Sequence, residues 1–464
     1  MSATIPEVSG GHPIIGHMGA FLRDPLGLLR RAQRECGDIA AFHLGPRRVV
    51  LLTGPGLHEV FFRASDEQLS QRDAYQLMIP VFGPGVVYDA PPERMIEQFH
   101  FLIPALQERR MRTYATLIAA EVDDAVADWG DAGTVDVYPF TRSLVGKTST
   151  RCLLGPEFRH ELTDEFESTY ADLEGGVKPL AYVAPNLPTP AFRRRDRARR
   201  DLQRLVGNVI ERRRKDGVAG EDFLQTMMDA SYADGSRPNE HEITGLLLAA
   251  MFAGRDTSSA SAAWALVELA RNGADQARLR AEIDQARASL ADAPIAALPA
   301  VDRFLKEVLR LHPPLFILLR RVIADLEIGG VRVPRGSLVA VSPTVAHGDS
   351  RVFQHPDRFD PDRFGPARAE DRRPFAYIPF GGGRHKCMGT AFAMLQLRTI
   401  IDAILSSYEL DMADDPVEAD YGVLVIGPKV PLRLRYRRRG TAATNSSLPA
   451  ADYGAAGVPH DAAV

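Results

Sequence analysis

The strongest constraint on the fold is one long helix signal, carried by the stretch PNEHEITGLLLAAMFAGRDTSSASAAWALVELARNG. Asn239 is placed to cap the first turn, with Glu242 three residues later as the return acceptor, and Asn272-Gly273 supplies a stop. At 1.5 Å per residue such a helix spans roughly 50 Å, which is enough to cross a whole domain. One helix face carries small residues beside a threonine, at spacings of three or four: Leu246, Ala250, Ala253, Thr257, Ser261 and Trp264.

The rest of the chain indicates a mainly α fold with a small β portion. Strand signals occur in IAAFHLGPRRVVLLTG and in LEIGGVRVPRGSLVAVSP, where Gly329-Gly330 and Pro334-Arg335-Gly336 mark turns. A chain of 464 residues has room for two or three domains, but no internal repeat or Gly/Ser-rich linker divides it. We therefore expect a single large domain over residues 1–436 and a disordered tail over 437–464, where the sequence becomes small, polar and aperiodic.

Composition and charge disfavour several classes of protein. A formal net charge of -4 gives no electrostatic reason to expect nucleic acid as a partner. Cys36, Cys152 and Cys387 are too scattered for a disulfide framework or a CxxC metal site, which favours a reducing, cytoplasmic setting. The first residues lack the pattern of a signal peptide, and no stretch reaches about eighteen uninterrupted apolar residues, so we expect no membrane anchor.

One of these cysteines has an unusual setting, FGGGRHKCMG, at residues 380–389. The glycines permit positive φ angles and close approach of the backbone to a flat partner. The sequence that follows predicts a helix, and the free N–H groups at its start would favour a thiolate at Cys387. The alternative is a buried structural cysteine beside a glycine turn, against which the flanking Arg384, His385 and Lys386 argue.

Four motifs follow one another in a fixed order, although each alone is weak. AGRDT lies within the long helix at 253–257, Glu307-x-x-Arg310 precedes Pro313-Pro314, PDRF occupies 361–364, and the cysteine loop comes last. An i, i+3 Glu–Arg pair is by itself an ordinary solvated helix face. Together the four resemble a haem-thiolate monooxygenase, a cytochrome P450, over nearly the whole chain, and this resemblance implies the cytochrome P450 fold.

The resemblance implies haem b as the cofactor. Cys387 would be the axial thiolate ligand of the iron, with Phe380 and Gly389 also in contact with the haem. A buried charge network would stabilise the fold around the cysteine loop without taking part in catalysis, and its members would be Glu307, Arg310 and Arg363.

The same resemblance assigns a role to two residues in the middle of the long helix. Asp256 and Thr257 are similar to the acid–alcohol pair that relays protons to dioxygen in this family. The Thr257 hydroxyl can bond back to the carbonyl of Ala253, open the helix locally and leave room for oxygen and water. A core threonine on a helix is the alternative interpretation.

A finer resemblance is to the sterol 14α-demethylases. The stretch AYQLMIPVFGPGVVYDAPPER resembles their substrate-loop signature, and MFAGRDTSSASAAW and LRLHPPLFILLR are also most similar to that branch. Carried over by position, four residues would bind the haem propionates: Tyr75, His100, Arg320 and His385. A long apolar substrate pocket would be lined by Leu77, Met78, Phe82, Phe252, Ala253, Leu315 and Phe316.

Two positions depart from that branch. The demethylases typically have histidine immediately before the helix threonine, where this chain has Asp256, and a lysine near a propionate, where it has Ile96. Aspartate is what ordinary hydroxylases of the family use. The sequence therefore predicts O2-dependent oxidation of a bulky lipophilic substrate, a sterol or a terpenoid-like natural product, with true sterol 14α-demethylase activity as the alternative.

Electrons must come from another protein, because no G-x-G-x-x-G run follows a predicted strand. A ferredoxin or a flavodoxin with its reductase is implied. Four basic residues near the cysteine loop either help to dock this acidic carrier or form a solvated patch: Arg372, Arg373, Arg384 and Lys386. We interpret the denser run FRRRDRARRDLQRLVGNVIERRRKDG as a solvated surface helix.

Two further classes of function stay open at this point. A haem-binding sensor would use the cysteine ligand without turnover, but such a protein needs no Asp256-Thr257 proton relay. An acyl-transfer enzyme would use Cys387 as a nucleophile and would keep its activity without haem. That enzyme needs a positioned base, and the nearness of His385 in sequence does not establish one.

Overall fold

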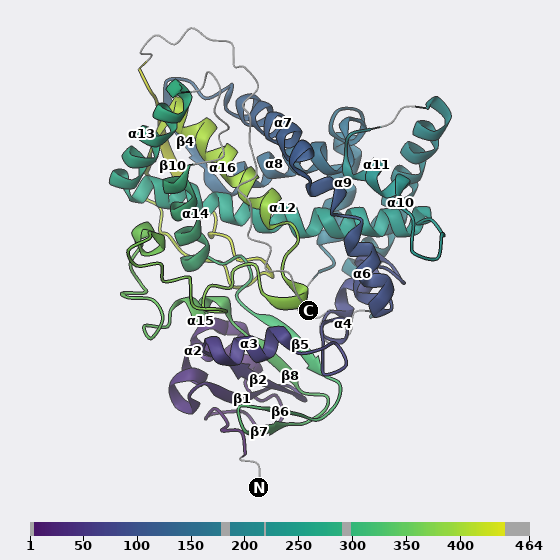
Figure 1. The fold of residues 1–464 in the computed structure, drawn as a ribbon, viewed down its shortest axis with the longest axis vertical. Helices are drawn as coiled ribbons and strands as arrows, with labels where there is room; N and C mark the ends of the chain where they lie inside the picture. Colours follow the sequence, from purple (N-terminus) through teal and green to yellow (C-terminus); the bar gives the residue numbers. More distant parts are fainter. Residues whose placement is uncertain (1–3, 178–185, 218–219, 290–297, 441–464) are drawn as a thin grey trace.

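The computed structural model of the protein describes residues 4–177, 186–217, 220–289 and 298–440. The described chain is mainly helical with small sheets, as the sequence predicts (Figure 1). The helices of the first half range from single turns to the 27-residue α10. Their bounds are α1 Met18–Arg23, α2 Pro25–Cys36, α3 Pro55–Arg63, α4 Gln71–Ala74, α5 Ile79–Phe82, α6 Pro92–His100, α7 Glu108–Val126, α8 Val137–Ser149, α9 Thr163–Glu174, α10 Pro190–Asp216 and α11 Phe223–Asp229.

The predicted long helix is α12, Glu240–Arg271, which crosses the whole molecule in Figure 1. Its predicted cap is confirmed, because Asn239 Oδ1 accepts from the Glu242 N–H at 3.0 Å and the Glu242 carboxylate accepts from the Asn239 N–H at 3.0 Å. Three of the remaining helices pack around its second half: α13 Gly273–Ser289, α14 Pro299–Leu311 and α16 Thr390–Ser407. The short helix α15 Pro343–His347 comes directly after a strand of the main sheet.

Both predicted strand regions form strands. The main sheet has the order β1-β2-β8-β5-β3, in which only β2 and β8 are parallel, and its strands are β1 Ile39–Leu44, β2 Arg47–Leu52, β3 Leu69–Ser70, β5 Leu318–Val322 and β8 Leu338–Val341. Two smaller sheets comprise β6 Leu326–Ile328 with β7 Val331–Val333, and β4 Ala132–Asp136 with β9 Tyr408–Met412 and β10 Arg433–Arg438. The last strand therefore runs two residues past the predicted domain boundary, and residues 441–464 of the predicted tail lie outside the described residues.

The main sheet is covered on both faces, which explains the continuous apolar run of β2. Val50 and Leu52 pack with α3 on one face, whereas Val49 and Leu51 pack with α2 on the other. This alternation follows from the two-residue period of a strand. The result is a small β layer at one end of the molecule, visible below the helical body in Figure 1.

The helical body contains two apolar clusters, and α12 belongs to both. The first half of α12 packs with α9, α10, α11 and the segment around residues 77–105, here called the first cluster. Its second half packs with α7, α8, α14 and α16, here called the second cluster. The stretch of α12 between the two clusters is the part that remains accessible, and the candidate site lies there.

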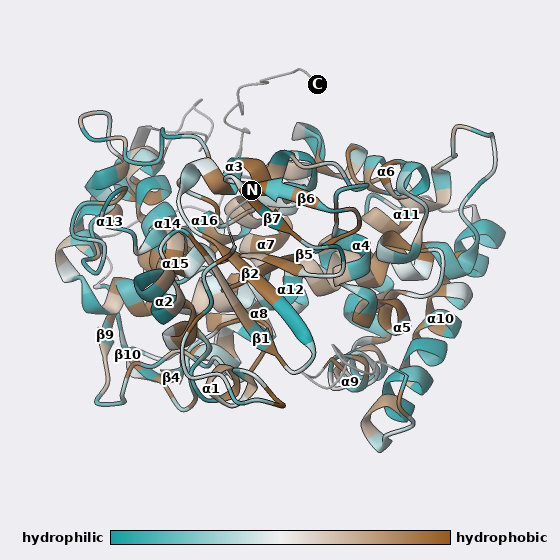
Figure 2. Ribbon diagram, turned by 90° about the horizontal axis from the view of Figure 1, so that it is seen from below, coloured by the Kyte–Doolittle hydropathy of each residue, from teal (hydrophilic) through white to brown (hydrophobic). Residues whose placement is uncertain are grey.

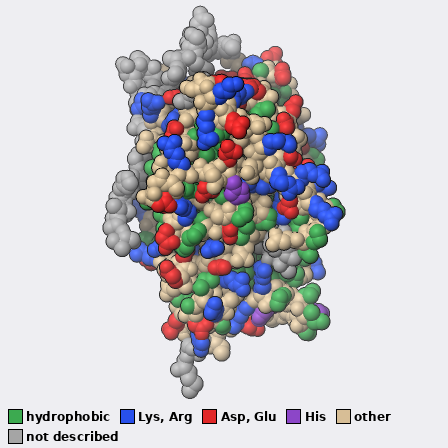
Figure 3. Space-filling model, turned by 90° about the vertical axis from the view of Figure 1, so that its right-hand side faces the viewer, with side chains coloured by type: hydrophobic (Ala, Val, Ile, Leu, Met, Phe, Trp, Pro, Cys, Tyr) green, Lys and Arg blue, Asp and Glu red, His purple; other side chains and the backbone are tan. Residues whose placement is uncertain are grey.

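The arginine-rich run forms α10, one continuous helix at the edge of the molecule and largely hydrophilic in Figure 2. Basic side chains are interspersed with acidic ones on the face shown in Figure 3, as expected for a solvated surface. Three of its arginines are nevertheless buried: Arg195, Arg199 and Arg213. Among the described residues, no helix is both long enough and apolar enough to cross a membrane.

Candidate active site

The middle of α12 differs from the rest of the helix in its exposure. Residues 243–248 and 258–269 are buried, whereas Ala253 is exposed and Thr257 is partly exposed. Thr257 Oγ1 donates to the carbonyl of Ala253 at 2.5 Å, which is the back-bond expected from the sequence. The helix is continuous through this point, so the expectation that the bond opens the helix is wrong. Small side chains provide the accessible space here instead.

The cysteine loop is shaped by two glycines in the left-handed region, Gly381 at φ +67° and Gly383 at φ +61°. A Cβ atom on Gly383 would overlap the carbonyl group of Phe62 at the end of α3, so glycine is required for the loop to approach that helix. The Cys387 N–H then donates to the Phe380 carbonyl at 2.9 Å and closes the turn. These contacts fix the cysteine just ahead of α16.

The Cys387 side chain is exposed, which argues against a buried structural cysteine. Burial of the sulfur by surrounding protein nevertheless raises the pKa of the Cys387 thiol, and the N–H of Gly389, the hydroxyl of Thr390 and the charge of Lys386 oppose this only in part. The groups at the start of α16 therefore favour the thiolate, as expected from the sequence, but in the protein alone burial of the sulfur outweighs them. The thiol is accessible although protein atoms surround much of it. An accessible cysteine sulfur in such a position can bind a metal ion, which deprotonates the thiol.

Four aromatic side chains form a continuous series that ends on α12. The Tyr75 and Tyr88 rings stack with centroids 5.3 Å apart, Phe82 lies 6.1 Å from Tyr88, and Phe252 meets Phe82 edge-on at 6.1 Å. Phe252 is adjacent to the exposed Ala253. The series belongs to the first cluster, which also buries two other predicted pocket residues, Leu77 and Met78.

Tyr88 was not predicted from the sequence as a site residue. Burial raises its pKa, and a smaller contribution comes from Cys387, so the phenol is neutral and lies on the side of the cysteine loop. The preceding Val87 has a φ of +48°, which is rare for a β-branched residue. Gln98 holds this strained turn, because its Oε1 accepts from the Val87 N–H at 2.8 Å and its Nε2 donates to the Gly85 carbonyl at 3.0 Å.

The residues predicted to bind haem propionates are only partly brought together. Arg320 is buried, donates to two backbone carbonyls at 2.6 and 3.5 Å, and has its pKa lowered to about 10 by burial. The Tyr75 hydroxyl accepts from the backbone N–H just before Arg320 at 3.3 Å. His385 Nε2 lies 2.7 Å from the Asp66 carboxylate, which leaves its Nδ1 for another partner. His100 is the exposed last residue of α6, and within the described residues no hydrogen bond joins its side chain to the other three.

Two predicted pocket residues lie elsewhere or at the margin. Phe316 packs against Phe21 at 6.2 Å and Tyr421 at 5.8 Å, in the cluster between the main sheet and α2, so the structure does not bring it together with Phe82 and Phe252. Leu315 is half-buried beside it. Ile96, at the position where the demethylases tend to have lysine, is exposed on α6.

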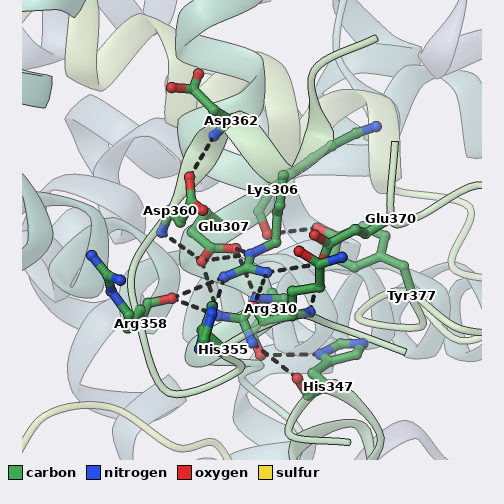
Figure 4. A network of polar contacts seen from close by, with 12 residues as sticks. Lys306, Glu307, Arg310, His347, His355, Arg358, Asp360, Asp362, Glu370 and Tyr377 are labelled. Atoms are coloured by element: carbon green, nitrogen blue, oxygen red, sulfur yellow. Dashed lines mark hydrogen bonds and ion pairs between the residues drawn. The ribbon is translucent and has the colours of Figure 1, made fainter. Parts of the chain in front are cut away.

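The three residues expected in a buried charge network are in contact, and their side chains are fully buried. Figure 4 shows Glu307 and Arg310 within the surrounding network of polar contacts. The Glu307 carboxylate accepts from Arg310 Nε at 2.7 Å and Nη2 at 2.9 Å, and from Arg363 Nε at 3.0 Å. It also accepts from the Asp360 N–H at 2.8 Å. Arg363 has a second acidic partner, Glu370, at 2.8 Å. Two cations and two carboxylates balance, as buried charges require.

This network reaches the cysteine loop through His347, a residue that the sequence did not single out. Arg310 Nη1 donates to the His347 carbonyl at 2.9 Å, and His347 Nδ1 lies 3.1 Å from the Arg310 carbonyl. The other ring nitrogen accepts from the Ile378 N–H at 2.9 Å, two residues ahead of Phe380. Burial lowers the pKa of His347 to about 3, so the ring is neutral and can accept this bond.

A model of the cytochrome P450 family matches residues 6–434. The chain belongs to the cytochrome P450 family. This P450 is thus a monooxygenase by family, an oxidoreductase that uses O2 and binds haem through a cysteine thiolate. The single family match over nearly the whole chain agrees with the fold expected from the sequence.

Similar proteins include the sterol 14alpha-demethylase of Mycolicibacterium vanbaalenii, which is 41% identical over 446 residues that cover 94% of this chain and 98% of that protein. The sterol 14alpha-demethylase of Mycobacterium tuberculosis is 41% identical, with 95% and 99% covered. The obtusifoliol 14-alpha demethylase of Sorghum bicolor is 35% identical, with 95% and 92% covered. This P450 therefore has sterol 14α-demethylases among its relatives.

Solved structures agree with this fold. A cyanobacterial P450 with bound retinoic acid has a TM-score of 0.82 at 23% identity, covering 95% of this chain and 100% of that one. The haem domain of a second P450 has a TM-score of 0.81 at 24% identity, covering 95% and 99%. At these identities the likeness concerns the fold alone.

The residues present fit a haem. Cys387 offers an accessible sulfur as the axial ligand, and Cys152 is fully buried. Ala253 and Thr257 present small side chains on α12, where a flat macrocycle needs room. Arg320 supplies the cation that suits a propionate.

Proposed function

We propose that this P450 oxidises a bulky lipophilic substrate, a sterol or a terpenoid-like natural product, with one oxygen atom of O2. The observation that carries the proposal is the aromatic series that runs from Tyr75 through Tyr88 and Phe82 to Phe252. Phe82 is buried, the other three rings are partly buried against the first cluster, and the series ends beside the accessible turn of α12. A wall of this kind suits a large apolar molecule with few polar groups.

The proposal gives each site residue a task. Cys387 would hold the haem iron, and when bound, thiolate-ligated haem supplies the activation of dioxygen. Thr257 would hold a proton at Oγ1 next to the accessible space, with its hydroxyl oriented by the Ala253 carbonyl. Asp256, the neighbouring acid, would replace that proton. The aromatic series would orient the substrate and exclude water from the same space.

True sterol 14α-demethylase activity is the second candidate, and the 41% identity to demethylases over most of the chain favours it. Asp256 favours simple oxygen insertion, because the acid stands where demethylases typically have histidine. The two candidates differ in product: a demethylase removes the methyl carbon in successive oxidations, whereas a hydroxylase retains every carbon of the substrate.

Electrons would come from a ferredoxin or flavodoxin with its reductase, in the cytoplasm. Four basic side chains near the cysteine loop are exposed and available to an acidic carrier: Arg372, Arg373, Arg384 and Lys386. Docking of this kind is electrostatic, so it weakens as salt rises.

The first experiment compares purified wild-type protein with Cys387→His by absorption spectroscopy of the reduced, carbon monoxide-bound form. The red-shifted Soret band of a thiolate-ligated haem is expected for the wild type and is lost in the variant. Titration with lanosterol-like sterols and with cyclic terpenes then follows the substrate-induced spectral shift, and mass spectrometry identifies the product. A haem sensor would give the band but no O2-dependent product. A spectrum indifferent to Cys387 would refute the proposal.

A further inference from the structure

The turn that follows α5, at Phe82–Pro84, is held by side chains from α10 and α12; Figure 2 shows α5 beside α10. Arg199 of α10 donates from Nη2 to the Phe82 carbonyl at 3.0 Å and to the His241 carbonyl at 3.2 Å. His241 is the second residue of α12, and its Nε2 lies 3.0 Å from the Pro84 carbonyl. Because a carbonyl only accepts, this nitrogen carries the proton. Arg199 and His241 together are here called the turn clamp.

The backbone of this turn lies too close to its neighbours for larger residues. Gly83 has a φ of +104°, and a Cβ atom there would lie 2.6 Å from His241 Cε1 and 2.9 Å from Arg199 Nη2. A Cβ atom on Gly245, one turn further along α12, would overlap the Phe82 carbonyl oxygen. The two glycines thus allow the turn to lie directly against α12, where close packing limits movement of the Phe82 backbone.

Arg199 is buried, yet among the residues that the structure describes no carboxylate pairs with it. Burial lowers the pKa of Arg199 to about 10, so the guanidinium remains a cation at neutral pH. Besides the two carbonyls it donates to Gln203 Oε1 at 3.3 Å, and within the same described residues its Nε has no partner. The charge is therefore stabilised by backbone dipoles, and it binds the Phe82 carbonyl more strongly than a neutral donor would.

The clamped backbone belongs to a ring of the aromatic series. The Phe82 ring lies 6.1 Å from Tyr88 and 6.1 Å from Phe252, so it joins the segment around residue 88 to α12. A side chain is placed by its own backbone, and a shift of the Phe82 carbonyl would therefore shift the ring relative to Phe252. The turn clamp acts on the wall of the proposed substrate space from behind, through the main chain.

We propose that Arg199 and His241 position the Phe82 ring and thereby determine how well bulky substrates fit against α12. The inference rests on the proposed function, because it presupposes that Phe82 meets the substrate. With the clamp broken, the turn is free to move, and a bulky apolar ligand loses a fixed wall. A small ligand of the haem iron does not reach that wall and is unaffected. Arg199 and His241 are positioning residues that touch no substrate.

Hydrogen–deuterium exchange of the haem-loaded protein tests the clamp without any substrate. In Arg199→Met, amides of residues 79–90 should exchange about tenfold faster than in the wild type, as loss of a charge-assisted hydrogen bond predicts. Arg200→Gln, an exposed position next to it, should leave the rate unchanged. Arg199→Lys keeps a cation and should restore part of the protection. His241→Ala removes the bond to Pro84 at a half-buried position and keeps the test decisive if Arg199→Met fails to fold.

Nitrogenous ligands test the effect on fit independently of the natural substrate, because a ring nitrogen can coordinate haem iron. Spectral titration compares imidazole, which is small, with 1-tritylimidazole, which is bulky and apolar. In Arg199→Met the dissociation constant of 1-tritylimidazole should rise about tenfold, whereas that of imidazole and the carbon monoxide spectrum stay as in the wild type. For a substrate that is turned over, KM should rise in the same way while kcat is unchanged. Arg199→Lys should reverse part of both changes.

Three results would overturn the inference. They are equal exchange at residues 79–90 in Arg199→Met and the wild type, faster exchange with an unchanged affinity for 1-tritylimidazole, and equal weakening of both imidazoles, which would indicate a general disturbance around the haem. If the wild type oxidises none of the candidate substrates, the proposed function fails, but exchange and the two imidazoles still decide whether the clamp positions Phe82.

Discussion

Removal of the charge on Glu307 should destabilise the protein more than any other change to a single acidic residue described above. Its carboxylate accepts five hydrogen bonds from Arg310, Arg363 and the Asp360 N–H, at 2.7 to 3.0 Å. In Glu307→Gln, one oxygen becomes an NH2 group that faces arginine donors. Two fully buried cations then lose their common partner.

The size of the effect follows from what the arginines retain. Breaking a buried ion pair by removing one partner costs about 3–5 kcal/mol. Arg363 keeps Glu370 at 2.8 Å, and Arg310 keeps two backbone carbonyls at 2.9 and 3.1 Å, so we expect about 4 kcal/mol, the middle of that range. An unfolding entropy of ~2.1 cal/mol/K per residue gives roughly 0.9 kcal/mol/K for a folded body of about 430 residues. The expected fall in Tm is therefore about 4 °C.

Differential scanning calorimetry of the haem-loaded protein measures this fall. The matched control is Glu327→Gln on β6, because Glu327 is exposed, and its Tm should move by less than about 1 °C. Failure of Glu307→Gln to accumulate as folded protein, while the control folds normally, would agree in direction. A Tm for Glu307→Gln that matches the control would refute the account of the network.

Three further predictions concern the site and its support. Thr257→Ala should lower the product formed per electron pair at least tenfold or so, because the proton-holding hydroxyl is lost, while substrate titration still gives the same spectral shift. Gly383→Ala should lower Tm and haem retention clearly more than Gly330→Ala, because both residues have positive φ but only a Cβ at 383 meets the Phe62 carbonyl. The wild type should lose stability as pH falls from 6.5 toward 3, because the unfolded state binds a proton there that buried His347 does not. His347→Gln removes this titration, so urea midpoints measured across that range should show a shallower decline.

Features set by neighbouring residues could be predicted from the sequence. The start of α12 depends on Asn239 and Glu242 three residues apart, so the cap and its helix were both foreseen. The cysteine loop depends on local glycines, two of which have positive φ. The alternation along β2 follows from strand geometry and from its continuous apolar run.

Features set by distant contacts could not be predicted. Arg199 resembles its neighbours in the arginine-rich run, yet it is buried because its Nη2 donates to the Phe82 carbonyl, 117 residues away, at 3.0 Å. Phe316 is as apolar as Phe82, and only the packing of α2 against the sheet decides that it lies in a different cluster. The pKa of Cys387 was expected to fall, but burial by the surrounding protein outweighs the local N–H groups.

The membership of α12 in both apolar clusters bears on how such an enzyme can change over evolution. The residues proposed to meet the substrate lie in the first cluster, whereas the helix that follows the cysteine loop lies in the second. Substitutions of first-cluster residues around 77–105 can therefore alter substrate specificity while the packing of α16 in the second cluster is unchanged. A mutant library confined to that segment should yield new specificities with little loss of cofactor, which makes this division of labour along one helix a route to functional diversity.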